Sequence, residues 1–260
     1  MKKEQLKRIF EFLEDKEGKS PKSKGTLLWK IFFNEPLTKE DLDIKGNLSL
    51  FDSNITSLPK GLKVGGNLDL RHSKIITSLP EGLKVGGVLD LSHSKIKSLP
   101  QGLEVNGRLY LINTNIKSLP EGFKVGGDLV LSETKIASLP EGLEVGGSLS
   151  LSKLEITSLP KNLKVGTGLY LYDCKNITSL PEGLEVGGYL SLLDLNITSL
   201  PKGLKVGGDL TLRGLNITSL PKGLEVGGNL FVVYSPLKKY TDDQLREMIK
   251  PGFIKGKIIR

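Results

Sequence analysis

Residues 57–70 read SLPKGLKVGGNLDL, and close copies of this stretch recur along most of the chain. The Leu-x-Leu pair at its end returns in steps of 20 residues, twice lengthened to 21, beginning at Leu48, Leu68, Leu89, Leu109, Leu129, Leu149, Leu169, Leu190, Leu210 and Leu230. A fixed period in this range is typical of proteins whose repeated units stack on one another. The repeat therefore decides the fold.

One repeat carries enough apolar side chains to fill the inside of a coil, but not enough to fold by itself. Strand alternation and spacing direct six of them inward in the second repeat, namely Leu68, Leu70, Ile75, Leu79, Leu83 and Val85. Pro80 and the pair Gly86-Gly87 mark the corners. Because stacking lets neighbouring coils share their buried faces, the sequence predicts a repeat solenoid with one parallel β-strand per coil, composed mostly of strand and turn.

The repeats are expected to occupy residues 48–234 as about ten strands, with caps at 1–47 and 235–260. The N-terminal cap is predicted to be helical, because apolar residues recur at helical spacing from Leu6 to Leu13, and an apolar stretch follows at 26–33. In the C-terminal cap, Thr241 and Gln244 form a capping-box pattern and Pro251 ends the helix. Residues 253–259 are predicted to add a closing strand.

The pattern L-x-L-x-x-[S/T]-x-I-x-S-L-P-x-G-L-x-V-G-G-x, from Leu48 to Tyr234, resembles the short bacterial class of leucine-rich repeats. Its glycine-rich form is similar to repeat proteins encoded by bacteria and bacteriophages. The resemblance implies a curved solenoid that binds other proteins. One column departs from the family, because a continuous asparagine ladder is replaced by Ser53, Ser73, Ser94, Thr114, Thr134, Leu154, Cys174, Leu195, Leu215 and Ser235.

Catalytic and cofactor motifs are not evident, so we expect a protein that is not an enzyme and uses no cofactor. The GLKVGG stretch lacks the Lys-Ser/Thr of a phosphate loop and the serine of a nucleophile elbow, and it is better explained as a turn. Cys174 falls in an inward column, which favours a structural role. His72 and His93 share one offset in adjacent coils, which makes a metal site conceivable, but stacked side chains on parallel strands favour no metal.

The formal net charge of +8 raises the question of nucleic-acid binding. Much of the excess falls in residues 235–260, where seven basic residues face three acidic ones. The outward positions of the Leu-x-Leu strands are instead acidic on balance, so we expect no nucleic acid on that face. The sequence has no apolar run of membrane-spanning length, and its one cysteine fits a reducing compartment. These features predict a cytoplasmic protein with no membrane contact.

The outward strand positions are where the repeats differ, and they carry most of the tyrosines. Large exposed aromatic residues are enriched in binding sites, whereas the variable residues between Pro and Val are nearly all Lys or Glu and indicate a solvated face. We expect a protein partner, with a basic and partly apolar segment, to bind on a concave sheet at Tyr170, Tyr172, Asp173, Tyr189, Leu193, Asp194 and Tyr110. The alternative is a structural component of an assembly, such as a phage particle.

Overall fold

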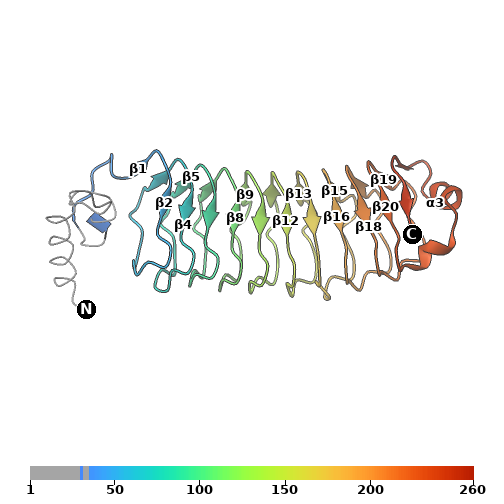
Figure 1. Ribbon diagram of the computed structural model, residues 1–260, viewed down its shortest axis with the longest axis horizontal. Helices are drawn as coiled ribbons and strands as arrows, with labels where there is room; N and C mark the ends of the chain where they lie inside the picture. Colours follow the sequence, from blue (N-terminus) through green and yellow to red (C-terminus); the bar gives the residue numbers. More distant parts are fainter. Residues whose placement is uncertain (1–29, 32–34) are drawn as a thin grey trace, which may run out of the picture.

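A computed structural model describes residues 30–31 and 35–260 of the chain. The repeats form a long, nearly straight parallel β-solenoid in which successive coils lie side by side along one axis (Figure 1). Most of the predicted N-terminal cap, including the helical pattern from Leu6 to Leu13 and most of the 26–33 stretch, lies outside the described residues.

Each coil contributes two short strands rather than the single strand that the repeat pattern predicted. The first strand carries the Lys/Glu-Val pair and the second begins at the first leucine of Leu-x-Leu, and each set forms its own 11-stranded parallel sheet. The second strand was missed because the valine was interpreted only as interior filling. Its neighbour points outward, however, and the pair Lys63-Val64 is in register with Lys84-Val85 of the next coil, which is the alternation of a strand.

The first sheet consists of β1 (Asp43–Ile44), β3 (Lys63–Val64), β5 (Lys84–Val85), β7 (Glu104–Val105), β9 (Lys124–Val125), β11 (Glu144–Val145), β13 (Lys164–Val165), β15 (Glu185–Val186), β17 (Lys205–Val206), β19 (Glu225–Val226) and β21 (Phe253–Ile254). The second sheet consists of β2 (Leu48–Ser49), β4 (Leu68–Asp69), β6 (Leu89–Asp90), β8 (Leu109–Tyr110), β10 (Leu129–Val130), β12 (Leu149–Ser150), β14 (Leu169–Tyr170), β16 (Leu190–Ser191), β18 (Leu210–Thr211), β20 (Leu230–Phe231) and β22 (Ile258–Ile259).

The core is a continuous aliphatic column inside the coils, as predicted, with one correction in the second repeat. Leu68, Leu70 and Leu83 are fully buried, but Ile75 is 46% exposed and Ile76 takes the inward position. This repeat is one residue longer than its neighbour, and the register of both sheets is kept across it. The extra residue is therefore accommodated outside the strands, and Ile75 is pushed out with it.

The Gly-Gly pair between the two sheets allows neighbouring coils to approach closely. Gly86 donates its N–H to Val64 at 2.8 Å, and Gly87 donates to Gly66 at 2.9 Å. A Cβ atom added to Gly86 would lie 2.2 Å from the carbonyl oxygen of Gly65, and similar collisions recur along the column. The first coil, which has no described coil before it, carries Lys45 at this position. Two interior coils keep the same backbone bonds with a side chain at the corner, Asn106 in the first glycine position and Thr167 in the second. Glycine is therefore the residue that fits this close approach in most coils, and those two coils accommodate a Cβ atom.

The C-terminal cap contains the predicted helix. A 3₁₀ turn, η1 (Pro236–Lys239), leads to α3 (Asp242–Met248), where the Thr241 and Gln244 side chains each accept a hydrogen bond from the other residue's backbone N–H. Leu237, Leu245 and Ile249 are fully buried against the last coils. The closing segment is confirmed but divided into two strands, β21 and β22, one for each sheet.

Replacing Gly146 with alanine tests the stacking constraint, because its Cβ would lie 2.2 Å from the Gly126 carbonyl oxygen. We expect the free energy of unfolding to fall by about 1–3 kcal/mol, the usual cost of overpacking, as measured by urea denaturation. The control is Gly46→Ala in the first coil, where a Cβ would meet no atom within 4 Å. Equal stability of the two variants would contradict the constraint.

Candidate functional site

Two of the predicted binding tyrosines lie against each other on the outer face of the second sheet. The Tyr170 and Tyr189 rings are 5.7 Å apart between centroids and tilted by 35°. Gly168 makes this possible, because a Cβ there would lie 2.7 Å from the Tyr170 ring. The ring of Tyr170 therefore lies along its own strand, over the glycine and toward the next coil.

Tyr172 and Leu193 extend this cluster beyond the ends of β14 and β16. The N–H of Asp173 donates to the Leu193 carbonyl at 3.3 Å, which sets Tyr172 and Leu193 side by side on adjacent coils. Tyr172 is 44% exposed and Leu193 is half-buried. On the coil of β16, Ser191 stands at the outward position between Tyr189 and Leu193, yet its side chain is only 4% exposed. We call Tyr170, Tyr172, Tyr189 and Leu193 the tyrosine patch.

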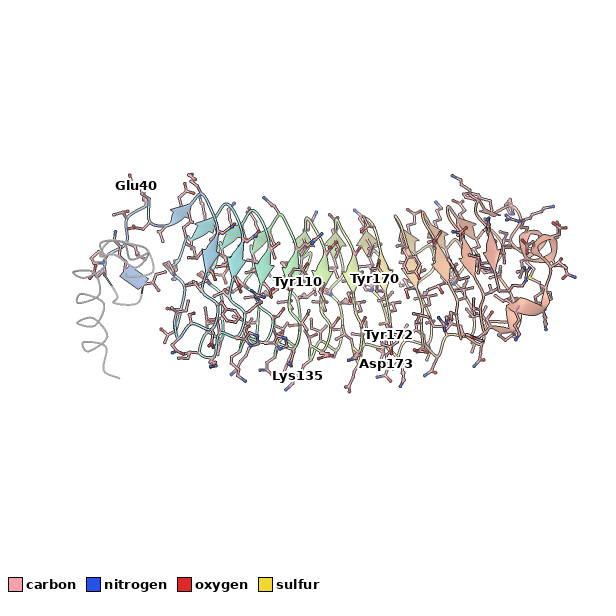
Figure 2. The ribbon with its side chains drawn as sticks, viewed as in Figure 1. Glu40, Tyr110, Lys135, Tyr170, Tyr172 and Asp173 are labelled. Atoms are coloured by element: carbon pink, nitrogen blue, oxygen red, sulfur yellow. The ribbon has the colours of Figure 1, made fainter. Side chains whose placement is uncertain are left out.

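Tyr110 does not join the tyrosine patch. It is half-buried on β8, and β10 and β12 separate its strand from β14. At about 4.8 Å per strand, Tyr110 and Tyr170 are some 14 Å apart along the sheet. Figure 2 shows Tyr110 and Tyr170 at the level of the sheet, with Tyr172 and Asp173 below Tyr170 where the strand has ended.

The predicted acidic edge of the patch is partly neutralised by a lysine. Asp173 is half-buried and pairs with Lys175 at 3.0 Å. The hydrogen bond to Asp173 raises the pKa of the Lys175 ammonium, and the charge of Asp194 adds to this effect. Asp194 itself is exposed. The edge therefore carries two carboxylates and one ammonium, and it remains acidic on balance.

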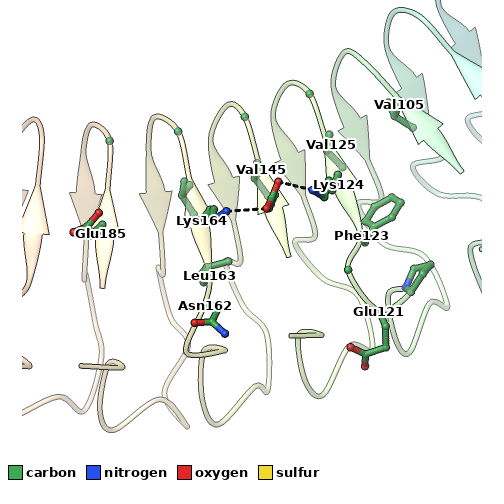
Figure 3. Close-up of a pocket in the computed structure, with 18 of the residues that line it drawn as sticks. Val105, Glu121, Phe123, Lys124, Val125, Val145, Asn162, Leu163, Lys164 and Glu185 are labelled. Carbon is green, nitrogen blue, oxygen red and sulfur yellow. Dashed lines mark hydrogen bonds and ion pairs between the residues drawn. The ribbon is translucent and has the colours of Figure 1, made fainter. Parts of the chain in front are cut away.

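One hollow of the solenoid lies over the first sheet, away from the tyrosine patch. A shallow, open hollow of about 1200 Å³ runs from β7 to β17, and none of the seven predicted binding residues lines it (Figure 3). That the Leu-x-Leu strands form a concave binding sheet stays a prediction, because this hollow lies over the other sheet. The tyrosine patch lies on a different face.

Charged side chains of alternating sign run along the outward positions of the first sheet from β5 to β19, whereas Lys63 on β3 lies beside Lys84 and has the same sign. We call this row the charge ladder, and it consists of Lys84, Glu104, Lys124, Glu144, Lys164, Glu185, Lys205 and Glu225. Glu144 pairs with Lys124 at 3.0 Å and with Lys164 at 2.9 Å, and these hydrogen bonds, with Lys164 the stronger influence, lower the pKa of the Glu144 carboxyl. Two further pairs, Lys84–Glu104 and Lys205–Glu185, have 2.6 and 2.8 Å separations.

The alternation has a simple electrostatic reason. In-register stacking places each outward residue beside its counterpart in the next coil, so an identical repeat would set like charges about 4.8 Å apart. Alternating Lys and Glu turns this repulsion into attraction. The solvated Lys/Glu face was predicted from composition, whereas the alternation emerges only when the coils are compared position by position.

The His72 and His93 rings are stacked, as their shared offset predicted. Their centroids are 4.9 Å apart with an interplanar angle of 4°, and the Nδ1 atom of His93 lies 3.2 Å from the Asn113 side-chain amide. Parallel rings direct their ring nitrogens in parallel, not toward one ion. Within residues 30–31 and 35–260, no group of three or more His, Cys, Asp or Glu side chains is arranged to hold a metal.

The backbone conformation helps to explain why histidine occurs at positions 72 and 93. We call the positions that share this offset in successive coils, from Asp52 to Tyr234, the histidine column. Its members occupy the left-handed region, with φ of 56° at His72, 59° at His93 and 73° at Gly214. Asp and Asn, which tolerate this region better than most residues, fill the column at Asp52, Asn113, Asp173 and Asp194. The column is selected in part by turn geometry, and this accounts for histidine there without a metal.

Cys174 was expected to have a structural role in the inward column. Its side chain is fully buried, and this burial raises the pKa of the thiol. In the part of the chain that the structure describes, no helix has the length and apolar character needed to cross a membrane.

No protein-family model matches the sequence, and a comparison with curated proteins found no significant match.

Reversing one charge tests the ladder. We expect Glu144→Lys to lower the thermal midpoint, because three ammonium groups would then lie on neighbouring coils, and we expect added salt to reduce the loss by screening. Glu121→Lys on the same face is the control, because its side chain has no ion pair among the described residues. Equal midpoints for the two variants at low salt would contradict the role of the ladder.

The lowered pKa of Glu144 also predicts a pH dependence. In the folded protein the pKa of the Glu144 carboxyl lies below its ordinary value of 4.5. The ionised carboxylate therefore stabilises the fold fully above pH 4.5, and this stabilisation is lost as pH falls through the folded pKa. We expect Glu144→Gln to be less stable than wild type at neutral pH and to converge with it in acid. Thermal melts across the pH range measure this, and a constant difference at all pH values would count against it.

Gly214 tests the left-handed column without disturbing contacts, because a Cβ there would meet no atom within 4 Å. We expect Gly214→Val to lower the free energy of unfolding by about 1–2 kcal/mol, the cost of the left-handed region for an ordinary residue. Gly214→Asn is the matched control and should lose less. Chemical denaturation of both variants checks the order, and a valine variant as stable as the asparagine variant would refute it.

Proposed function

We propose that the chain is a non-enzymatic scaffold that binds a protein partner through the tyrosine patch on the outer face of the second sheet. The observation that supports this most is the exposure of Tyr170 and Tyr172, at 38% and 44%, on adjacent outward positions of one coil. Tyrosines of this kind bury large areas at little entropic cost and dominate the energetics of many interfaces. The first sheet, by contrast, uses its outward charges to pair with one another.

The proposed partner offers a basic and partly apolar segment. Tyr170, Tyr189 and Leu193 give the patch an apolar centre, and the carboxylates of Asp173 and Asp194 outnumber the Lys175 ammonium at its edge. Edge charges of this kind mainly guide the encounter, whereas the aromatic centre supplies most of the affinity. The same acidic edge disfavours a phosphate backbone.

We further propose that the solenoid is of the short leucine-rich-repeat type found in bacteria and their phages, and that it works in the cytoplasm. The leucine and isoleucine positions of the repeat and the buried free thiol of Cys174 support this. The competing proposal is a structural component of an assembly, which would be attached through the ends of the solenoid.

The test begins with affinity capture from a lysate of the native host, followed by titration of the recovered partner. We expect Tyr172→Ala with Tyr189→Ala to weaken binding by about 2 kcal/mol or more, the scale of interface hot spots, while circular dichroism stays unchanged. The control is Lys161→Ala with Lys164→Ala, because both residues line the hollow of the first sheet.

Loss of binding in the lysine variant with full binding in the tyrosine variant would move the site to the hollow. Full binding by both variants, with loss only when residues 235–260 are altered, would favour the structural component. Either result would overturn the proposed site.

A further inference from the structure

Within the described structure, β21 and β22 are the last strands of the two sheets, so their outer edges lack the neighbouring coil that pairs with each interior strand. In the first sheet, each of the last two coils donates three N–H groups to the coil before it, the first of them from Glu225 to Leu204 at 3.1 Å and, one coil later, from Phe253 to Leu224 at 3.0 Å. Gly227 donates to Val206 and Gly228 to Gly208, both at 2.8 Å. One coil later, Lys255 donates to Val226 at 2.9 Å and Gly256 to Gly228 at 2.8 Å.

This register identifies the acceptors that a further coil would use. Val226 corresponds to Ile254 and Gly228 corresponds to Gly256. The carbonyl groups of Ile254 and Gly256 are therefore two of the three at which the first sheet would continue beyond β21, and the third is that of Gly252, which corresponds to Leu224. Unsatisfied strand edges of this kind are templates for pairing with another chain.

The side chain of Arg246 occupies two of these three positions. From α3, its Nη1 atom donates to the Ile254 carbonyl and its Nη2 atom donates to the Gly256 carbonyl at 2.9 Å. A guanidinium presents several N–H groups in a rigid plane, so one side chain replaces two of the three amides that a following coil would supply. Both carbonyls that it binds are ones that the stacking register leaves open.

The surrounding cap holds Arg246 in place. The capping box fixes the start of α3, and Leu245, next to Arg246, is fully buried. Arg260 ties the end of the last coil back to the cap by donating to the Tyr240 carbonyl at 2.9 Å. Ile254 and Ile258, in the last coil, are only 3% and 7% exposed. The cap therefore covers the core as well as the edge.

We infer that Arg246 closes the C-terminal edge of the first sheet against pairing with a second copy of this chain. A second copy is the occupant that fits, because its C-terminal end presents the same edge strand β21, and two identical edges can pair across a two-fold axis. The basic excess of residues 235–260 adds a repulsion between two such ends, and salt screens this repulsion.

Sedimentation equilibrium of the full chain over a range of concentrations tests the inference. We expect Arg246→Ala to form dimers that increase with salt, while wild type and the control Arg213→Ala stay monomeric. Arg213 is an exposed arginine whose guanidinium lies over the Tyr234 ring, away from the last coil. A monomeric Arg246→Ala protein under all conditions, or a wild-type protein that assembles equally, would overturn the inference.

A cysteine reporter separates pairing of ends from aggregation of a damaged fold. Lys257→Cys places a thiol in the last coil, and Lys161→Cys places one in the hollow over the first sheet. The native Cys174 is buried. We expect Arg246→Ala to increase oxidative cross-linking of the Lys257→Cys protein several-fold over the same protein with Arg246 intact. Cross-linking of the Lys161→Cys protein should not change. Equal cross-linking at both positions would show general aggregation and reject the inference.

Discussion

In-register stacking is the constraint on which the rest of this molecule depends. Each coil lies about 4.8 Å from the next, so every side chain has its own counterpart from the neighbouring repeat beside it. The neighbouring coils approach most closely at the Gly-Gly corners, because the glycine N–H groups bond directly to the preceding coil and a Cβ atom added to most of these glycines would collide with it. A single coil has no comparable way to satisfy its backbone.

The faces of the solenoid meet this constraint differently. Inside, identical aliphatic residues simply pack on each other. Along the first sheet, identical charges would repel, and the alternation from Lys84 to Glu225 avoids this. At the left-handed turns, Asp, Asn and Gly reduce the backbone cost that other residues pay. The second sheet is the face on which side chains vary most freely, and there the Tyr170–Tyr189 pair is formed around a glycine that only this coil has at that position.

Much of the fold could be predicted from the sequence because the repeat states each buried position many times. The aliphatic core, the capping box at Thr241 and the stacking of His72 on His93 all followed from period and spacing. The second strand of each coil did not, since a two-residue strand has too little alternation to distinguish it from a corner. Ile75 was misplaced because an insertion shifts the inward position by one, and only the packing decides which isoleucine is buried.

The candidate site was predicted only in part. Repeat comparison located the outward tyrosines, but not the Gly168 gap that brings Tyr170 against Tyr189, nor the distance of Tyr110 from them. The hollow over the first sheet depends on the shape of the whole stack, which no single repeat encodes. Arg246 was also invisible from sequence, because its role depends on which carbonyls the last coil leaves open.

Amide hydrogen exchange followed by NMR tests the central claim most directly, because it reports the backbone bonds that join neighbouring coils. The account predicts two protected sets in each interior coil, one at corner glycines such as Gly146 and Gly166, and one at strand leucines such as Leu149 and Leu169. A solenoid with one strand per coil would protect only the leucines. Corner glycines that exchange as fast as the exposed residues Thr157 and Ser158 would contradict the two-sheet stack.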